Sequence, residues 1–201
     1  MCNLYRMRSN VAEIGNLFNA ANSAGNLPVL DEIYPNQPAP IVRDAGSGRT
    51  IETLTWGFPP PGQVKRPVTN VRNLDSPFWR SALSRPDRRC LVPVTAFCEW
   101  TGKAGSKREV WFALNDADLF AFAGIWRPVA DEAARFAFLT CAPNNLVGAV
   151  HPKAMPVILT AETAETWLTA DWDEARSLAQ PFPGERMHVV TDRPTKTDLF
   201  G

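Results

Sequence analysis

Short apolar runs separated by turn residues dominate the pattern of hydrophobic and polar positions along the chain. Runs of this kind, rich in β-branched and aromatic residues and bounded by Pro, Gly, Asn or Asp, are typical of β-strands. They predict strands over 41–43, 50–56, 90–100, 110–114, 119–126, 134–141, 157–159 and 187–190. A break inside 90–100 is expected at Pro93, because proline cannot donate a ladder hydrogen bond. The rest of 24–50, rich in Pro, Gly and Asn, is predicted to be irregular.

Helical spacing of apolar residues is confined to a few segments. The first predicted helix covers 11–20, where Asn10 and Glu13 have the spacing of a capping box. Three further helices are predicted over 76–83, 163–168 and 171–179. Many strands joined by turns, with a few peripheral helices, indicate an α+β fold around a mostly antiparallel or mixed, barrel-like sheet. Neither a βαβ series nor a Gly-rich phosphate loop is present, which disfavours a nucleotide-cofactor fold.

Length and composition describe an ordinary globular chain. At 201 residues, a single domain over 1–201 is the expectation. An apolar fraction of 45% and a charged fraction of 21% argue against a disordered chain. The chain contains no run of about 18 apolar residues, so no membrane span is predicted. The first residues lack a basic region followed by an apolar stretch, so we expect a cytoplasmic, bacterial-type protein, and a monomer.

Charge is balanced over the whole chain but unevenly spread. The 21 basic and 21 acidic residues cancel, which weakens a nucleic-acid interpretation. Residues 43–90, however, hold nine basic and four acidic side chains, whereas the chain from Ala161 onward holds eight acidic and four basic ones. The basic middle is either a local patch for polyanions or a solvated surface with chance asymmetry.

Four cysteines are too widely spaced to form a recognisable metal motif. They are Cys2, Cys90, Cys98 and Cys141. Without a C-x-x-C pair or a secretory signal, neither a metal site nor a disulfide framework is expected, and no cofactor is predicted. Cys2 differs from the others because it follows the initiator Met1. If Met1 is removed, Cys2 carries both a free α-amine and a thiol.

Two titratable residues interrupt apolar segments. Glu99 ends an almost uncharged strand, between Cys98 and Trp100. A carboxylate in such a place must be paired or must take a raised pKa, which suits acid/base work, although it could also only end a strand. His151 follows an apolar segment and precedes a Pro-interrupted loop, where a histidine is either structural or catalytic.

An N-terminal cysteine offers two nucleophiles. The α-amine has a reference pKa near 7.7–8.0 and the thiol one near 8.5, so both are partly deprotonated at neutral pH. The amine can attack an aldehyde to give an imine, and the thiol can then close a thiazolidine ring. Alternatively, Cys2, His151 and Glu99 form a cysteine-hydrolase set that attacks an amide. Cys2 could also be an inert buried residue.

An ordered set of motifs runs from the N-terminus to about Leu168. Its parts are Met1-Cys2, Trp56-Gly57-Phe58, Asn70-Val71-Arg72, Arg89-Cys90-Leu91-Val92-Pro93, Phe97-Cys98-Glu99-Trp100, Ala123-Gly124-Ile125-Trp126, and His151 leading to Met155-Pro156-Val157-Ile158-Leu159. No single part is specific, but the ordered set is. It resembles the SOS response-associated peptidase (SRAP) family, the abasic-site-shielding DNA–protein cross-linkers.

The resemblance implies roles for individual residues. Cys2 of the mature chain would form a thiazolidine with the ring-opened sugar aldehyde of an abasic site in single-stranded DNA. Asn70 would hold Cys2 or the sugar, Glu99 would act as acid and base, and His151 would assist imine chemistry, which also supports strand cleavage by β-elimination. Arg72 would bind phosphate. The peptidase-like act would be the exposure of Cys2 by removal of the preceding residue.

The chain departs from the family pattern where DNA is expected to bind. Leu4 stands where the family often has an arginine, and Lys153 replaces an arginine before Met-Pro. Lysine can still meet a phosphate as a point charge. An abasic site has no base to read, so binding should come from phosphate contacts and stacking of flanking bases. The predicted DNA-binding residues are Arg72, Lys153, Trp56 and Phe58, with Phe78 and Trp79 as further stacking candidates.

Three functions therefore stay open at this point. The leading hypothesis is covalent trapping of abasic sites in single-stranded DNA, with lyase and self-processing peptidase activity. The alternative is a Cys-dependent amidohydrolase or peptidase acting on peptides. The third is a single-stranded DNA-binding module in which Cys2 is inert.

Overall fold

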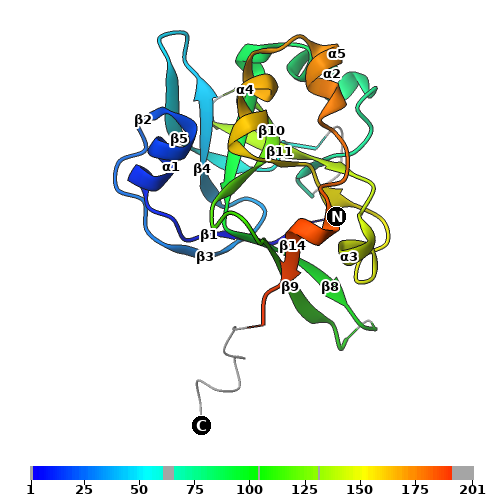
Figure 1. The fold of residues 1–201 in the computed structure, drawn as a ribbon. Coiled ribbons are helices and arrows are strands. Elements are labelled where there is room, and N and C mark those ends of the chain that lie inside the picture. The colour runs from blue at the N-terminus through cyan, green and yellow to red at the C-terminus, as the bar shows by residue number, and fades with distance from the viewer. Residues whose placement is uncertain (1, 61–65, 104, 131, 192–201) are drawn as a thin grey trace.

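Within the residues that the computed structural model describes, 2–60, 66–103, 105–130 and 132–191, five strands close into a barrel (Figure 1). In order around the barrel they are β11 (Glu132–Cys141), β10 (Phe120–Val129), β7 (Arg89–Val94), β4 (Pro38–Asp44) and β5 (Arg49–Trp56). Neighbours are antiparallel except at the closing pair, where β5 runs parallel to β11. The predicted α+β fold with a mixed, barrel-like sheet is confirmed.

Aromatic rings form the centre of the core. Trp56 stacks on Phe138 with ring centroids 5.1 Å apart, and Phe122 lies 4.7 Å from the same Phe138 ring. Tyr5 meets Trp56 edge-on at 5.1 Å. All four side chains are fully buried, and rings of this size contribute much of the apolar area that stabilises a core. Because Tyr5 belongs to this cluster, the segment just after Cys2 is anchored on the barrel.

A second sheet holds the N-terminal segment. Its strands, in spatial order, are β14 (Met187–Val189), β9 (Arg108–Leu114), β8 (Ala96–Thr101), β1 (Tyr5–Met7) and β3 (Leu30–Ile33). Tyr5 pairs with Phe97 of β8 on one side and with Ile33 of β3 on the other. The β8–β9 hairpin extends away from the barrel (Figure 1). The segment from Leu4 to Arg6 therefore lies along β8.

The remaining elements surround the barrel. They are α1 (Val11–Phe18), β2 (Ala20–Asn22), β6 (Asn70–Val71), α2 (Pro77–Leu83), α3 (Asn145–Gly148), β12 (Met155–Pro156), β13 (Ile158–Leu159), α4 (Ala161–Thr169), α5 (Trp172–Ser177) and two 3-10 turns, Pro86–Arg88 and Gly184–Arg186. The helices α2, α4 and α5 gather at one end of the molecule (Figure 1). No helix in the described part is long and apolar enough to cross a membrane.

Local helix signals were predictive. The capping box at the start of α1 is present, because Asn10 Oδ1 accepts from the Glu13 amide while Glu13 Oε2 accepts from the Asn10 amide. Ser76 caps α2 as its sequence indicated, with Oγ accepting from the Phe78 amide. These interactions lie within one helical turn, which is why the sequence reveals them.

Two strand predictions were wrong in ways that have a physical explanation. The break in 90–100 falls at Thr95, whose amide donates to Arg6 O, while Pro93 lies inside β7 opposite Ala121. The stretch 24–50, predicted to be irregular apart from a strand over 41–43, contains β3 and a longer barrel strand β4. Strand β4 pairs with β7 at Val42 and Leu91. Pro38 and Pro40 lie before this pair, so they interrupt little of the ladder between β4 and β7.

Candidate active site

Cys2 lies fully buried beside strand β8. Its thiol points at two backbone carbonyl oxygens, with Sγ 3.4 Å from Leu4 O and 3.8 Å from Cys98 O. The Cys98 amide donates to Leu4 O at 2.9 Å, which fixes the N-terminal segment against β8. Burial, reinforced by the nearby Glu99 carboxylate, raises the pKa of the Cys2 thiol well above its usual range. The thiol is therefore protonated at neutral pH in this structure.

Asn70 holds the backbone of Cys2. Strand β6 runs parallel to β11, with Asn70 beside Phe138, and this pairing brings Asn70 to the N-terminal segment. Its Nδ2 donates to Cys2 O at 3.0 Å and to Thr69 Oγ1 at 2.7 Å. Its Oδ1 is buried and has no hydrogen-bond partner among the described residues. A buried acceptor without a donor is uncommon in folded proteins.

Glu99 is the buried carboxyl that the sequence indicated. It lies on β8 opposite Val110, and its side chain is 2% exposed. Burial raises its pKa to about 7, because the charged form loses its hydration. Its Oε1 has no hydrogen-bond partner in the described structure. A carboxyl with these properties can both give and take a proton near neutral pH.

His151 lies in the loop after α3 and faces Glu99. Its amide donates to Val147 O at 2.8 Å, and its ring Nδ1 lies 3.0 Å from Ala154 O and 3.8 Å from Glu99 Oε2. Burial lowers the pKa of the ring, so the neutral form prevails at pH 7. A neutral ring that donates from Nδ1 to Ala154 O carries its lone pair on Nε2.

The structure thus brings Cys2, Asn70, Glu99 and His151 into one neighbourhood from four separate parts of the chain. Sequence reasoning missed two residues that orient them. Thr69 positions the Asn70 amide, and the Ala154 carbonyl positions the His151 ring. Each lies within three residues of its predicted neighbour, but neither carries a pattern that distinguishes it from an ordinary loop residue.

Arg72 and Lys153 are exposed cations that lie close in sequence to two residues of this site. Arg72 follows Asn70 by two residues and Lys153 follows His151 by two, and both side chains are exposed. Neither has an ion-pair partner in the described part of the chain. Exposed, unpaired cations next to a buried acid and thiol suit an anionic substrate.

Trp56 and Phe58 correct the predicted DNA-binding set. Both side chains are 0% exposed. Trp56 stacks on Phe138 inside the barrel and donates from Nε1 to Thr69 O at 3.1 Å, while the Arg127 guanidinium covers the Phe58 ring. Neither ring can stack on a base in this structure, because β5 and the turn after it direct both inward.

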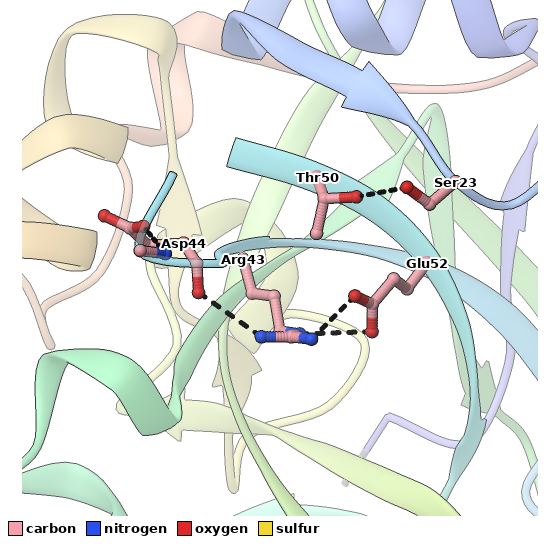
Figure 2. Close-up of polar contacts among 6 residues, drawn as sticks. Ser23, Arg43, Asp44, Thr50 and Glu52 are labelled. Carbon is pink, nitrogen blue, oxygen red and sulfur yellow. Dashed lines mark hydrogen bonds and ion pairs between the residues drawn. The ribbon is translucent and has the colours of Figure 1, made fainter. Parts of the chain in front are cut away.

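The basic stretch 43–90 is not one continuous patch. Figure 2 shows Arg43 held by both oxygens of Glu52, with its guanidinium also near Asp44 O. Other arginines of the stretch are paired or buried: Arg49 with Glu165, Arg85 with Asp87, and Arg89 with the carbonyls of Trp167 and Ala170. Lys65 lies outside the described residues. The cations left for a polyanion are thus fewer than the composition indicated.

Comparisons with known proteins agree on family and fold. A family model described as SOS response associated peptidase (SRAP) matches residues 1–193. A crystal structure from Bacteroides thetaiotaomicron is similar with a TM-score of 0.81 and 23% identity, covering 95% of this chain and 93% of that chain. Another, from Bordetella bronchiseptica, has a TM-score of 0.77 and 24% identity, covering 94% and 100%.

A third similar structure is a phage-related protein from Bordetella bronchiseptica, with a TM-score of 0.73, 22% identity and coverage of 94% of each chain. At these identities the three structures establish the fold. No curated protein matches the chain.

Proposed function

The chain belongs to the SOS response associated peptidase family, and from that premise we propose that its mature form traps abasic sites in single-stranded DNA through Cys2. The observation that carries the proposal is the meeting of one buried acid, one neutral imidazole and one amide around an N-terminal cysteine. An aldehyde trap needs an amine, a thiol and a group that transfers protons between them.

The first step frees the amine. Hydrolysis of the Met1–Cys2 peptide bond consumes one water and releases methionine, leaving Cys2 with an α-amine. This is the peptidase-like act in the proposal. Met1 itself lies outside the described residues. The unpaired Asn70 Oδ1 is a suitable acceptor for a hydrogen of the new amine, because Asn70 already holds the carbonyl of the same residue.

The second step joins protein and sugar. The Cys2 nitrogen attacks the C1′ aldehyde of the ring-opened abasic sugar and gives a carbinolamine. Loss of one water, with a proton supplied by Glu99, leaves a protonated imine whose nitrogen keeps its hydrogen. The Cys2 sulfur then adds to the imine carbon, and the thiol proton returns to Glu99. The sum is amine, thiol and aldehyde giving thiazolidine and water, so no redox partner is needed.

Glu99 and His151 divide the proton transfers. A carboxyl with a pKa of about 7 is populated in both forms at neutral pH, so Glu99 can protonate the leaving hydroxyl and later accept the thiol proton. The neutral His151 ring beside it can take a proton from the sugar C2′, which is the step that turns an imine into β-elimination and strand cleavage. Lyase activity is therefore a branch from the same imine.

A thiolate-based peptidase acting on other peptides fits less well. Such an enzyme needs a cysteine of lowered pKa beside a cationic histidine. Here burial and Glu99 raise the pKa of Cys2, and burial lowers that of His151, so the neutral pair dominates. In thiazolidine formation the thiol can attack an already activated imine, and a stable thiolate is not required.

Burial of Cys2 sets a condition on the proposal. The side chain is 0% exposed in the structure described, so removal of Met1 must open a path from solvent to the sulfur. Intact mass and thiol-labelling kinetics on the same sample test this condition. We expect that chains starting at Cys2 are labelled at that residue faster than chains starting at Met1.

The decisive experiment mixes the protein with a single-stranded oligonucleotide carrying one abasic site and resolves the products on a denaturing gel. A heat-stable adduct that is absent in Cys2→Ala supports the proposal. Cys98→Ala is the matched control, because Cys98 is also a buried thiol on the adjacent strand. Turnover of amide substrates without an adduct would instead identify a peptidase, and salt-sensitive binding without an adduct would identify a binding module.

A further inference from the structure

A small cationic cavity lies between α2 and the end of β10, outside the candidate active site. Its volume is about 100 Å³. Organic ligands of drug size need roughly 300 Å³ or more, so this cavity suits one small group such as a phosphate. The lining side chains used below are Phe58, Phe78, Trp79, Arg85, Arg88 and Arg127.

Arg127 is the cation at the centre of the argument. Its guanidinium lies 4.3 Å from the centroid of the Phe58 ring and 4.5 Å from that of Phe78, so it is held between two aromatic faces. Its hydrogen bond goes to the Phe78 carbonyl at 3.5 Å, and no carboxylate pairs with it among the described residues. Burial lowers its pKa. A half-buried arginine that has no carboxylate partner among the described residues is suited to an external anion.

Two further arginines line the same cavity. Arg85 and Arg88 share one carboxylate, Asp87, with nitrogen–oxygen distances of 2.7 Å and 3.7 Å. Together with Arg127, the cavity thus has three cations against one acid. Arg88 also stacks on Trp126, with its guanidinium 4.7 Å from the ring centroid.

Arg43 provides a comparison, because it is an arginine with a carboxylate partner. It stacks on the same Trp126 ring, at 4.6 Å, but it is bound by both oxygens of Glu52 (Figure 2). Arg127 has the same aromatic support without such a carboxylate. Among the described residues, Arg43 and Arg127 therefore differ in that only Arg43 has a carboxylate partner.

The cavity is connected to the candidate active site through one stretch of chain. Phe58 pairs with Val68, which precedes Asn70 by two residues, a span of at most about 7 Å. Trp79 donates from Nε1 to the carbonyl of Asn73, the residue after Arg72. The segment from Val68 to Asn73, which carries Asn70 and Arg72, therefore contacts two of the residues that line the cavity.

We infer that this cavity is a backbone-phosphate subsite of the polynucleotide, with Arg127 as its principal ligand. The inference rests on the proposed function, because it assigns the path of the same DNA strand. The rings of Phe58 and Phe78 hold the guanidinium plane, and Arg85 and Arg88 add charge. The subsite contributes affinity without base specificity, as phosphate contacts do.

The test measures binding of an oligothymidylate without abasic sites to full-length protein in a Cys2→Ala background, over a series of salt concentrations. Arg127→Gln is expected to weaken binding about tenfold at low salt and to reduce the slope of log K against log salt by about 0.7. Arg127→Lys keeps the charge and should recover most of the slope but not all of the affinity. Arg186→Gln is the matched control, because Arg186 is paired with Asp116 and lies outside this cavity.

The outcomes separate this inference from the proposed function. A reduced slope in Arg127→Gln but not in Arg186→Gln supports the subsite, and an unchanged slope in a folded Arg127→Gln overturns it. If Arg127→Gln does not fold, Arg88→Gln is judged by the same criterion. Tight binding of inorganic phosphate or thymidine monophosphate alone, lost in the same variants, would overturn the polynucleotide assignment. Failure of Cys2 to form an adduct rejects the proposed function but does not affect this measurement, since the oligothymidylate has no aldehyde.

Discussion

The His151 ring Nδ1 lies 3.8 Å from Glu99 Oε2, although the two residues are far apart in the chain. Glu99 comes from strand β8, and His151 comes from the loop after α3. Burial raises the pKa of Glu99 to about 7 and lowers that of His151, so at neutral pH a carboxyl that is populated in both forms lies beside a neutral ring. The proposed chemistry needs both residues, because Glu99 transfers protons at the imine step and His151 takes a proton from the sugar.

Replacing Glu99 by glutamine removes the proton donor while keeping the shape of the side chain. We expect Glu99→Gln to slow adduct formation on abasic DNA by about 100-fold or more, because positioned acid/base groups contribute on that scale. The measurement is the single-turnover rate of adduct formation. Glu109→Gln is a suitable control, since Glu109 lies on the neighbouring strand β9. A variant with the parent rate would remove Glu99 from the mechanism.

The same carboxyl predicts a pH dependence of stability. Its pKa is about 7 in the folded chain against 4.5 as a free group, so the folded state binds the proton more tightly. The free energy of unfolding should therefore fall as the pH rises from about 4.5 to about 7, by of order 1–3 kcal/mol. Glu99→Gln should lose this fall and become more stable than the parent above pH 7.

Urea unfolding of parent and Glu99→Gln across this range measures the effect. His151 acts in the opposite direction, because its lowered pKa means that stability is lost as the pH falls below about 6.5. The difference between parent and variant isolates Glu99, since both retain His151. A difference that does not change with pH would show that the Glu99 pKa is ordinary.

Cys2→Ser separates the two bonds of the proposed adduct. The serine amine can still form an imine, but its hydroxyl is a weaker nucleophile than a thiol and should not give a stable ring. We expect an adduct that borohydride reduction traps and that heat otherwise destroys. The denaturing gel, run with and without reductant, makes the comparison. A heat-stable Cys2→Ser adduct without reductant contradicts thiazolidine formation.

Arg72 is the exposed cation nearest to Asn70 in sequence. If it binds a DNA phosphate, Arg72→Ala should weaken binding equally for all sequences and reduce the salt slope by about 0.7. Fluorescence anisotropy with two oligonucleotides of different sequence tests both statements. Arg186→Ala is the control, and an affinity that is unaltered at every salt concentration rejects the phosphate role.

The glycine of the motif Ala123-Gly124-Ile125-Trp126 is required by close packing between two barrel strands. A Cβ at this position would lie 2.8 Å from Cys90 Sγ and 2.9 Å from Val92 Cγ2, on the facing strand β7. Both contacts are too close, so Gly124→Ala must displace the barrel wall. We expect a loss of about 1–3 kcal/mol in the free energy of unfolding. Ala123→Gly is the comparison, because it adds no atom, and equal stability of Gly124→Ala and parent would show that the wall adapts.

Much of the fold was predictable because its signals are local. The capping box at Asn10 and the Ser76–Pro77 start of α2 involve neighbours in sequence. The apolar runs predicted β5, β9, β10 and β11 separately, and β7 and β8 as one run. Strand β4 was identified only in its 41–43 part, because its prolines conceal the alternation. Barrel closure was expected only in general terms, since the parallel pairing of β5 with β11 joins distant segments.

For the candidate site, too, some properties follow from the sequence and others only from tertiary structure. The sequence determined which residues could do chemistry: an N-terminal cysteine, an acid inside an apolar strand, and a histidine and an asparagine in ordered motifs. Tertiary structure decided that these four residues lie close together and that Cys2 is buried. It also decided that the side chains of Trp56 and Phe58 point inward. The position of Arg127 between the Phe58 and Phe78 rings was likewise decided by tertiary structure. Residue type sets what a group can do, but its proton affinity and its partners depend on which distant segments exclude water from it.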